Sequence, residues 1–256
     1  MGLSLVSIVT SETSASIRAR VNACQGILLD WDGCVAYGDV PHADGLAFLF
    51  AHRDRIAIVS NNSTLRPQDI CKILAKAGLT FAKERVILAG HQALVRAAQL
   101  QKPTLVLGSM QMKSLAREIG LLQVNKNPEV IVLLRDTRFS YARLFLTVNA
   151  LFAGGHLIVS NPDLTHPGVS GSVVPETGAL LAAITACMPP HCQNIEVIGK
   201  PSPQLFERAC ASLGIAVAEA IMIGDNPSTD IVGAQALNME SLLVSPGSNL
   251  CLGNLC

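Results

Sequence analysis

Short apolar runs alternate with amphipathic stretches along most of the chain. Five runs of β-branched and aliphatic residues show no polar alternation and predict strands buried on both faces: 27–29, 56–59, 197–198, 221–223 and 242–244. Helical spacing appears between them, as at Ile70, Ile73, Leu74 and Ala77. Strands that alternate with helices in this way indicate an α/β fold with a parallel sheet.

Two of the predicted helices carry residues that mark their ends. Pro67 can begin the first helix and Gly78 can end it. In the second, Ser202 is the expected N-cap, Pro203 the first helical residue and Gly214 the residue after the last turn. Both helices should pack on the predicted sheet.

A second group of strand and helix patterns occupies the middle of the chain. Apolar runs at 105–107, 130–134 and 157–159 are separated by helical patterns around 91–99, 110–119 and 141–152. About a hundred residues are enough for an independent α/β unit. We therefore expect a core domain made of residues 1–80 and 180–256, interrupted by an inserted α/β domain at 81–179.

Composition narrows the class of protein. The chain has 256 residues, 50% of them hydrophobic and 15% charged, which excludes a disordered protein and allows a large core. Nineteen basic residues balance nineteen acidic ones, so we expect neither a nucleic-acid partner nor a membrane partner. No apolar run approaches the ~18 residues of a membrane span. Eight scattered cysteines and a start without basic residues favour reduced thiols and a cytoplasmic location.

Polar residues that could carry chemistry follow four of the predicted strands. In chain order they are Asp30 and Asp32, then Ser60, Asn61 and Asn62, then Lys200, and finally Asp225 with Asp230 close behind. The carboxyl ends of parallel strands meet at one edge of a sheet, where ligands bind. Taken singly, each group has a simpler explanation, because such residues also cap helices, form turns or stay solvated on loops.

Taken together, the four groups match the parts of a phosphoryl-transfer site. Asp30 and Asp32 should face the same side, and two carboxylates so close need a proton or a divalent cation between them. The hydroxyl and amide donors at 60–63 suit an oxyanion such as phosphate. Prolines follow Lys200 and restrict the backbone there, which suits an ammonium that must be aimed.

In this order the motifs resemble those of the haloacid dehalogenase-like superfamily of aspartate-nucleophile phosphatases, over nearly the whole chain. More narrowly, the sequence is similar to the subgroup of 4-nitrophenylphosphatases, the N-acetylglucosamine-operon phosphatase, pyridoxal phosphatase and phosphoglycolate phosphatase. The narrower resemblance rests on three segments: Ser160-Asn161-Pro162-Asp163, Gly199-Lys200-Pro201-Ser202-Pro203 and Gly224-Asp225-Asn226 with Asp230. It implies a Rossmann-like parallel-sheet core with an inserted α/β cap between the second and third motifs.

The resemblance also implies a role for each candidate residue. Asp30 would be the nucleophile and Asp32 the general acid and then the general base. Phosphate would be bound by Ser60, Asn61, Asn62 and Lys200, with Asp230 supporting Lys200. Mg²⁺ would be held by Asp30, the backbone carbonyl of Asp32 and Asp225. These roles describe hydrolysis of a small phosphate monoester through an aspartyl-phosphate intermediate.

Other functions use similar residues. A phosphomutase employs the same groups but returns the phosphoryl group to a second hydroxyl, and its cap is generally helical. A signalling module of the receiver type is about half this length and has no insert. A non-catalytic phosphate-binding protein could keep the same fold, but the intact Asp30, Asp32, Lys200 and Asp225 argue against it. Asp32 favours turnover of a small phosphorylated metabolite, over which the cap, through 161–168, is expected to close. Three questions stay open: which ester is the substrate, whether Cys34 and His42 have a role, and whether the protein forms a homodimer through the cap.

Overall fold

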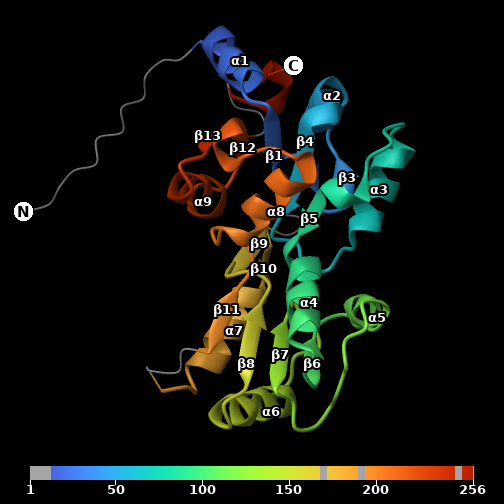
Figure 1. Cartoon of the computed structure of the whole chain (residues 1–256), viewed down its shortest axis with the longest axis vertical. Coiled ribbons are helices and arrows are strands. Elements are labelled where there is room, and N and C mark those ends of the chain that lie inside the picture. Colours follow the sequence, from blue (N-terminus) through green and yellow to red (C-terminus); the bar gives the residue numbers. More distant parts are fainter. Residues whose placement is uncertain (1–12, 168–171, 190–193, 246–249, 256) are drawn as a thin grey trace, which may run out of the picture.

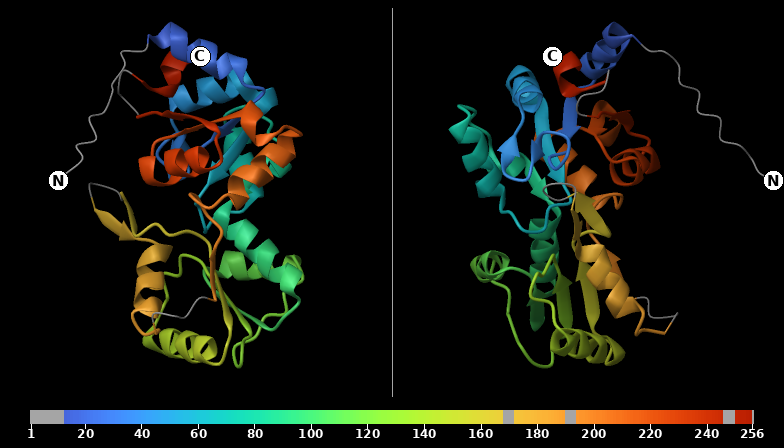
Figure 2. Two further views of the ribbon diagram at one scale, coloured as in Figure 1. Left: turned by 60° about the vertical axis from the view of Figure 1, so that its left-hand side comes forward. Right: turned by 180° about the vertical axis from the view of Figure 1, so that it is seen from behind.

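Two parallel sheets lie at opposite ends of an elongated molecule (Figure 1), and the views in Figure 2 show the same separation. The computed structural model describes residues 13–167, 172–189, 194–245 and 250–255. The core sheet has the strand order β13 (Glu240–Leu243), β12 (Ala220–Gly224), β1 (Gly26–Leu29), β4 (Ile56–Ser60) and β5 (Val86–Leu88). The cap sheet has the order β11 (Ile195–Val197), β8 (His156–Val159), β7 (Val130–Leu133) and β6 (Thr104–Leu107).

Helices cover both faces of the core sheet, which is why its strands lack polar alternation. One face carries α8 (Gln204–Leu213) and α9 (Val232–Ala236), and the other carries α1 (Ser14–Ala23), α2 (Ala43–His52) and α3 (Pro67–Lys76). Leu28 packs in one buried cluster with Phe206, and its neighbour Ile27 packs in the other with Phe48. Successive residues of β1 therefore bury apolar side chains on opposite faces.

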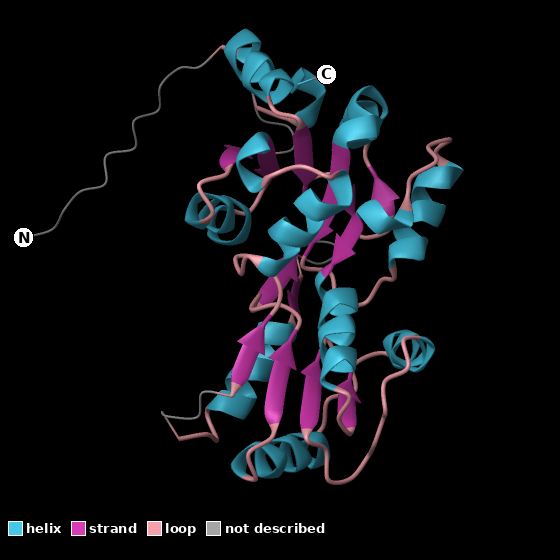
Figure 3. Cartoon of the chain, viewed as in Figure 1, coloured by secondary structure: helices cyan, strands magenta, loops and turns pink. Residues whose placement is uncertain are grey.

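The cap sheet is covered in the same manner (Figure 3). Helices α4 (Ala89–Leu100) and α5 (Met110–Glu118) lie on one face, and α6 (Tyr141–Phe152) and α7 (Thr177–Thr185) on the other. Two antiparallel hairpins, β2 (Ala36–Tyr37) with β3 (Val40–Pro41) and β9 (Thr165–Pro167) with β10 (Val173–Pro175), follow β1 and β8. The strands and helices predicted for the middle of the chain are confirmed.

The two helices with marked ends form as predicted, apart from one start. The first runs from Pro67 to Lys76, and Gly78 follows it in the left-handed region at φ +83°. The second ends before Gly214, also left-handed at φ +70°. It starts one residue later than expected, because Pro203 occupies the N-cap position instead of the first helical one.

Sheet pairing places two segments differently from the sequence expectation. β5 is hydrogen-bonded to β4, so Val86–Leu88 belong to the core sheet. β11 pairs with β8, so the run at 197–198, expected to be a core strand, lies at the end of an edge strand of the cap sheet. Both runs are short and apolar, and such runs do not specify which sheet receives them. From this pairing we propose that the inserted domain spans residues 89–198 instead of 81–179.

Several connections contain a short helical turn. Single 3₁₀ turns occur at Arg53–Arg55, Lys83–Arg85, Val217–Glu219 and Leu252–Leu255, and a π-helical turn at Pro227–Ile231 leads directly into α9.

Cysteines 24, 34, 71, 187, 210 and 251 are free thiols, while residues 192 and 256 lie outside the described ranges. None of the helices in those ranges has the length and apolar character needed to cross a membrane.

The central strand of the core sheet gives a stability prediction. Leu28 is completely buried two residues before Asp30, so Leu28→Ala should lower the free energy of unfolding by about 2–5 kcal/mol. Urea denaturation measures this change. Leu122→Ala is the control, since Leu122 is 60% exposed and its truncation should change stability by less than about 0.5 kcal/mol. Equal losses in the two variants would contradict the assignment of β1 to the core.

Candidate active site

A buried lysine that follows a strand of the cap sheet lies among the strand ends of the core sheet. Lys200 follows β11 and is only 2% exposed. Its Nζ donates to Asp30 Oδ1 at 2.6 Å and to the carbonyl of Val59 at 2.9 Å, and lies 2.6 Å from Asp230 Oδ1. Asp30 and Asp230 are also buried. Three segments far apart in the sequence therefore share one ion cluster.

The charges of this cluster depend on one another. Burial raises the pKa of Asp30 well above its usual value; the ammonium of Lys200 opposes that shift, and the carboxylates of Asp230 and Asp225 add to it. Burial alone would lower the pKa of Lys200, but Asp230 and Asp30 together raise it above its ordinary value. Lys200 therefore remains protonated and supplies a fixed positive charge beside Asp30.

A third carboxylate completes an acidic group that could hold a metal ion. Oxygens of Asp30, Asp225 and Asp230 lie within 4.8 Å of one another. Gly33 lies against Asp225: its φ is +89°, and a Cβ there would be 2.4 Å from the Asp225 carboxylate. When all three carboxylates are ionised, they exceed the one ammonium by two negative charges, which a divalent cation would balance. Donors that are all oxygen favour Mg²⁺ over zinc.

Asp32 lies at the exposed side of this cluster. Ser60 Oγ donates to Asp32 Oδ2 at 2.9 Å, and Asn62 Nδ2 donates to the same oxygen at 3.3 Å. Partial desolvation raises the pKa of Asp32 above its usual value, although the hydrogen bonds from Ser60 and Asn62 lower it. The two donors fix a carboxylate that still reaches solvent.

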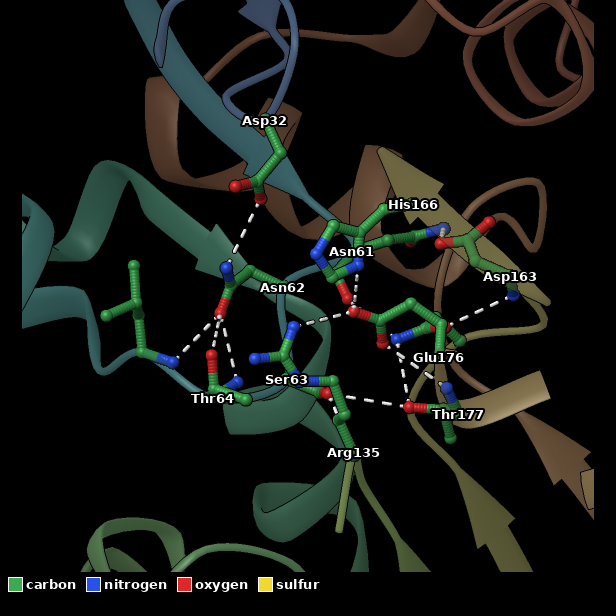
Figure 4. Close-up of polar contacts among 12 residues, drawn as sticks. Asp32, Asn61, Asn62, Ser63, Thr64, Arg135, Asp163, His166, Glu176 and Thr177 are labelled. Atoms are coloured by element: carbon green, nitrogen blue, oxygen red, sulfur yellow. Dashed lines mark hydrogen bonds and ion pairs between the residues drawn. The ribbon is translucent and has the colours of Figure 1, made fainter. Parts of the chain in front are cut away.

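The two asparagines after β4 have different places. Asn62 Oδ1 accepts from the backbone N–H groups of Thr64 and Leu65 at 3.0 and 2.8 Å, which shapes the turn before α3. Asn61 instead turns toward the cap, where its Nδ2 donates to Asp163 Oδ2 at 2.9 Å (Figure 4) and to the carbonyl of Lys200 at 3.0 Å. The phosphate-binding role predicted for Asn61 does not fit its side chain, because both amide hydrogens are already donated.

Figure 4 also shows polar residues at the cap boundary that the sequence analysis did not select. Arg135 donates to Glu176 Oε1 at 2.9 Å, and His166 Nδ1 lies 2.8 Å from the same oxygen. The backbone N–H of Arg135 donates to Ser63 Oγ at 3.0 Å. The motif at 160–163 pointed to this boundary, but Arg135 and Glu176 stand in segments without a recognisable pattern.

The contacts of Cys34 and His42 are structural. His42 caps α2, where its Nδ1 accepts from the N–H of Gly45 at 3.0 Å, and its Nε2 lies 2.6 Å from the carbonyl of Cys34. Burial raises the pKa of the Cys34 thiol well above its usual value. Burial therefore favours the protonated thiol over the reactive thiolate.

Comparisons with known proteins agree with the motif analysis. Residues 27–122 match the family model described as haloacid dehalogenase-like hydrolase, and residues 197–250 match one described as HAD-hydrolase-like. Dihydroxyacetone phosphatase of Corynebacterium glutamicum is 29% identical, covering 86% of this chain and 80% of the relative. A 5'-nucleotidase of Bacillus subtilis is 28% identical, covering 87% and 88%. The crystal structure of glycerol phosphate phosphatase from Mycobacterium tuberculosis in complex with magnesium has a TM-score of 0.76 at 27% identity, covering 90% of this chain and 70% of that one.

The ion cluster yields a second stability prediction. Lys200→Met removes the ammonium between Asp30 and Asp230 and leaves their charges uncompensated. In metal-free buffer near neutral pH, the free energy of unfolding should fall by about 3–5 kcal/mol in urea titrations. Lys72→Met is the matched control, because Lys72 is 76% exposed and pairs with Asp69 at 3.7 Å on the surface, where such pairs contribute about 0–1 kcal/mol. A Lys200→Met variant as stable as the control would refute the charge balance.

Proposed function

The chain belongs to the haloacid dehalogenase-like hydrolases and is a phosphatase, and we propose that it hydrolyses small phosphate monoesters through a phosphoaspartate formed on Asp30. The observation that carries this proposal is the placement of Lys200 at 2.6 Å from both Asp30 and Asp230, beside Asp225. A buried carboxylate can attack a phosphorus atom whose oxygens are negatively charged when a fixed ammonium beside it offsets that charge, and the neighbouring carboxylates can hold a metal ion.

In the first step, a carboxylate oxygen of Asp30 attacks phosphorus while the bond to the ester oxygen breaks. The ammonium of Lys200 is positioned to offset negative charge on the phosphoryl oxygens through its own charge, and it needs no reorganisation because Asp30, Asp230 and the carbonyl of Val59 already hold it in place. Ser60, at the end of β4, places its hydroxyl beside Asp32, to which it donates.

Asp32 supplies and then removes a proton. As a carboxylic acid it would protonate the departing ester oxygen; as a carboxylate it would take a proton from the water that cleaves the phosphoaspartate. Its raised pKa favours the protonated form required first, and the hydrogen bonds from Ser60 and Asn62 hold the carboxylate in one orientation. Separate acid and nucleophile roles thus fall to two aspartates with different surroundings.

Asp30, Asp225 and the backbone carbonyl of Asp32 are the expected Mg²⁺ ligands. Bound Mg²⁺ would neutralise the carboxylates and the phosphate of the substrate, and the excess of two negative charges in the cluster fits this role. Asp230 is less available as a ligand, because its Oδ1 faces Lys200 and its Oδ2 accepts from the N–H of Asn226 at 3.1 Å.

The substrates are expected to be small phosphorylated metabolites. The cap stands over the carboxyl ends of the core strands (Figure 1), and closure of such a cap would exclude large esters and bulk water. The similar proteins are named for dihydroxyacetone, nucleotide and glycerol phosphate substrates, which are all small. A panel of such esters, assayed for phosphate release with Mg²⁺, identifies the preferred one.

Replacing the aspartates tests the proposed mechanism. Asp30→Asn should abolish phosphate release, because an amide cannot serve as the nucleophile. Asp32→Asn should reduce kcat by about 10²–10⁴-fold, the usual contribution of general acid–base catalysis. Asp54→Asn, on the exposed surface, is the control with unchanged activity. Wild-type rates in either active-site variant would exclude the assigned roles.

Metal binding is tested without turnover. Mg²⁺ should raise the melting temperature, since a ligand at a hundred times its Kd stabilises the native state by about 2.7 kcal/mol. Asp225→Asn should remove most of this shift, while Asp54→Asn should keep it. If Mg²⁺ stabilised the Asp225→Asn variant as much as the wild type, Asp225 would not be a ligand.

A further inference from the structure

The side chain of Asn61 connects three strand ends at the boundary of core and cap. It follows β4 of the core, and its Nδ2 donates to Asp163 Oδ2 at 2.9 Å after β8 of the cap. The same nitrogen donates at 3.0 Å to the backbone carbonyl of Lys200, which follows β11. One amide therefore contacts the cap and the lysine segment at once.

The surroundings of Asn61 leave little freedom. Asn161, 1% exposed, donates from its Nδ2 to the carbonyl of Asn61 at 2.9 Å. Gly199 lies directly against the side chain: a Cβ there would be 2.6 Å from Asn61 Oδ1 and 2.5 Å from the carbonyl of Ser160. Backbone atoms of the cap and of the segment that carries Lys200 thus enclose Asn61. A shift of one of these two segments would therefore disturb the other through Asn61.

We propose that Asn61 and Asp163 are positioning residues for catalysis: Asp163 of the cap holds Asn61 against the carbonyl of Lys200, which sets the ammonium of Lys200 beside Asp30. The proposal rests on the proposed phosphatase function. It assigns Asn61 no side-chain contact with substrate, because both hydrogens of its amide go to Asp163 and Lys200. Asp163 acts on the nucleophile through Asn61 and the lysine.

This arrangement couples the position of the cap to the chemistry in the core. The ammonium of Lys200 is fixed at its far end by Asp30, Asp230 and the carbonyl of Val59. Its backbone end is fixed by the donation from Asn61. When Asp163 is lost, the backbone end can move while the ammonium stays attracted to both carboxylates, so the lysine is strained or displaced without loss of the fold.

A double-mutant cycle tests the coupling with 4-nitrophenyl phosphate and Mg²⁺. Asp163→Ala and Asn61→Ala should each lower kcat by about 10-fold, the scale of a hydrogen bond to a charged group. The double variant should be no worse than Asn61→Ala, because the two residues act as one unit. The Michaelis constant should stay nearly constant, since an interaction that matters only during phosphoryl transfer lowers kcat and kcat/KM equally.

Asn194→Ala is the matched control. Asn194 also donates from its Nδ2 to two backbone carbonyls, of Gly154 and Gly155, but it lies within the cap away from Lys200. Its kcat should equal that of the wild type. Melting temperatures of all variants separate a loss of stability from a loss of positioning.

An exchange of partners gives a second test that does not depend on truncation. Asn61→Asp sets two carboxylates against each other and should lower kcat by more than about 10-fold. Adding Asp163→Asn restores a donor and an acceptor across the same gap and should recover part of that loss. Recovery would be incomplete, because a carboxylate at position 61 has no hydrogen to donate to the carbonyl of Lys200.

The outcomes separate this inference from the proposed function. If the wild-type protein released phosphate from no ester, the proposed function itself would fail. If the wild type were active but Asp163→Ala kept the wild-type kcat, only the positioning role would be overturned. Additive losses in the cycle, or no recovery in the exchanged pair, would also overturn it. Non-additive losses with a constant KM would support it.

Discussion

The balance of charge around Lys200 constrains the rest of the structure. Two buried carboxylates, Asp30 and Asp230, would each cost several kcal/mol without a partner, and one ammonium serves both. Because Lys200 follows a strand of the cap sheet, this charge can reach the core only if the chain crosses back at that point. The same interaction that stabilises the core therefore fixes where the cap is attached.

The parallel topology explains how distant motifs meet. In the core sheet β1 lies between β12 and β4, so the residues after these three strands share one edge. The sequence allowed this meeting of Asp30, Ser60 and Asp225 to be predicted, because a polar residue directly after an apolar run is a local signal. Its spatial consequence follows from strand direction alone. Lys200 joins them although its strand belongs to the other sheet.

The features that could not be predicted from the sequence depend on contacts between residues that lie far apart in the chain. The runs at 86–88 and 195–197 have no property that assigns one to the core sheet and the other to the cap sheet. Asn61 is flanked by donors on both sides, and its side chain turns toward Asp163 and the carbonyl of Lys200, both far away in the sequence. Arg135 and Glu176 pair across two loops, which no periodicity reveals. In each case the deciding partner lies far away in the sequence.

The division between core and cap separates two chemical tasks. In the proposed mechanism, attack on phosphorus and charge neutralisation involve the strand ends of the core and Lys200, and these steps are the same whatever alcohol departs. The alcohol itself would meet the cap, where Arg135, His166 and Glu176 form their own polar group. Substitutions in the cap can therefore change the ester without disturbing the ion cluster. The restriction is that Asn61 and Asp163 must keep the cap seated on the lysine segment, because there the two tasks share a contact.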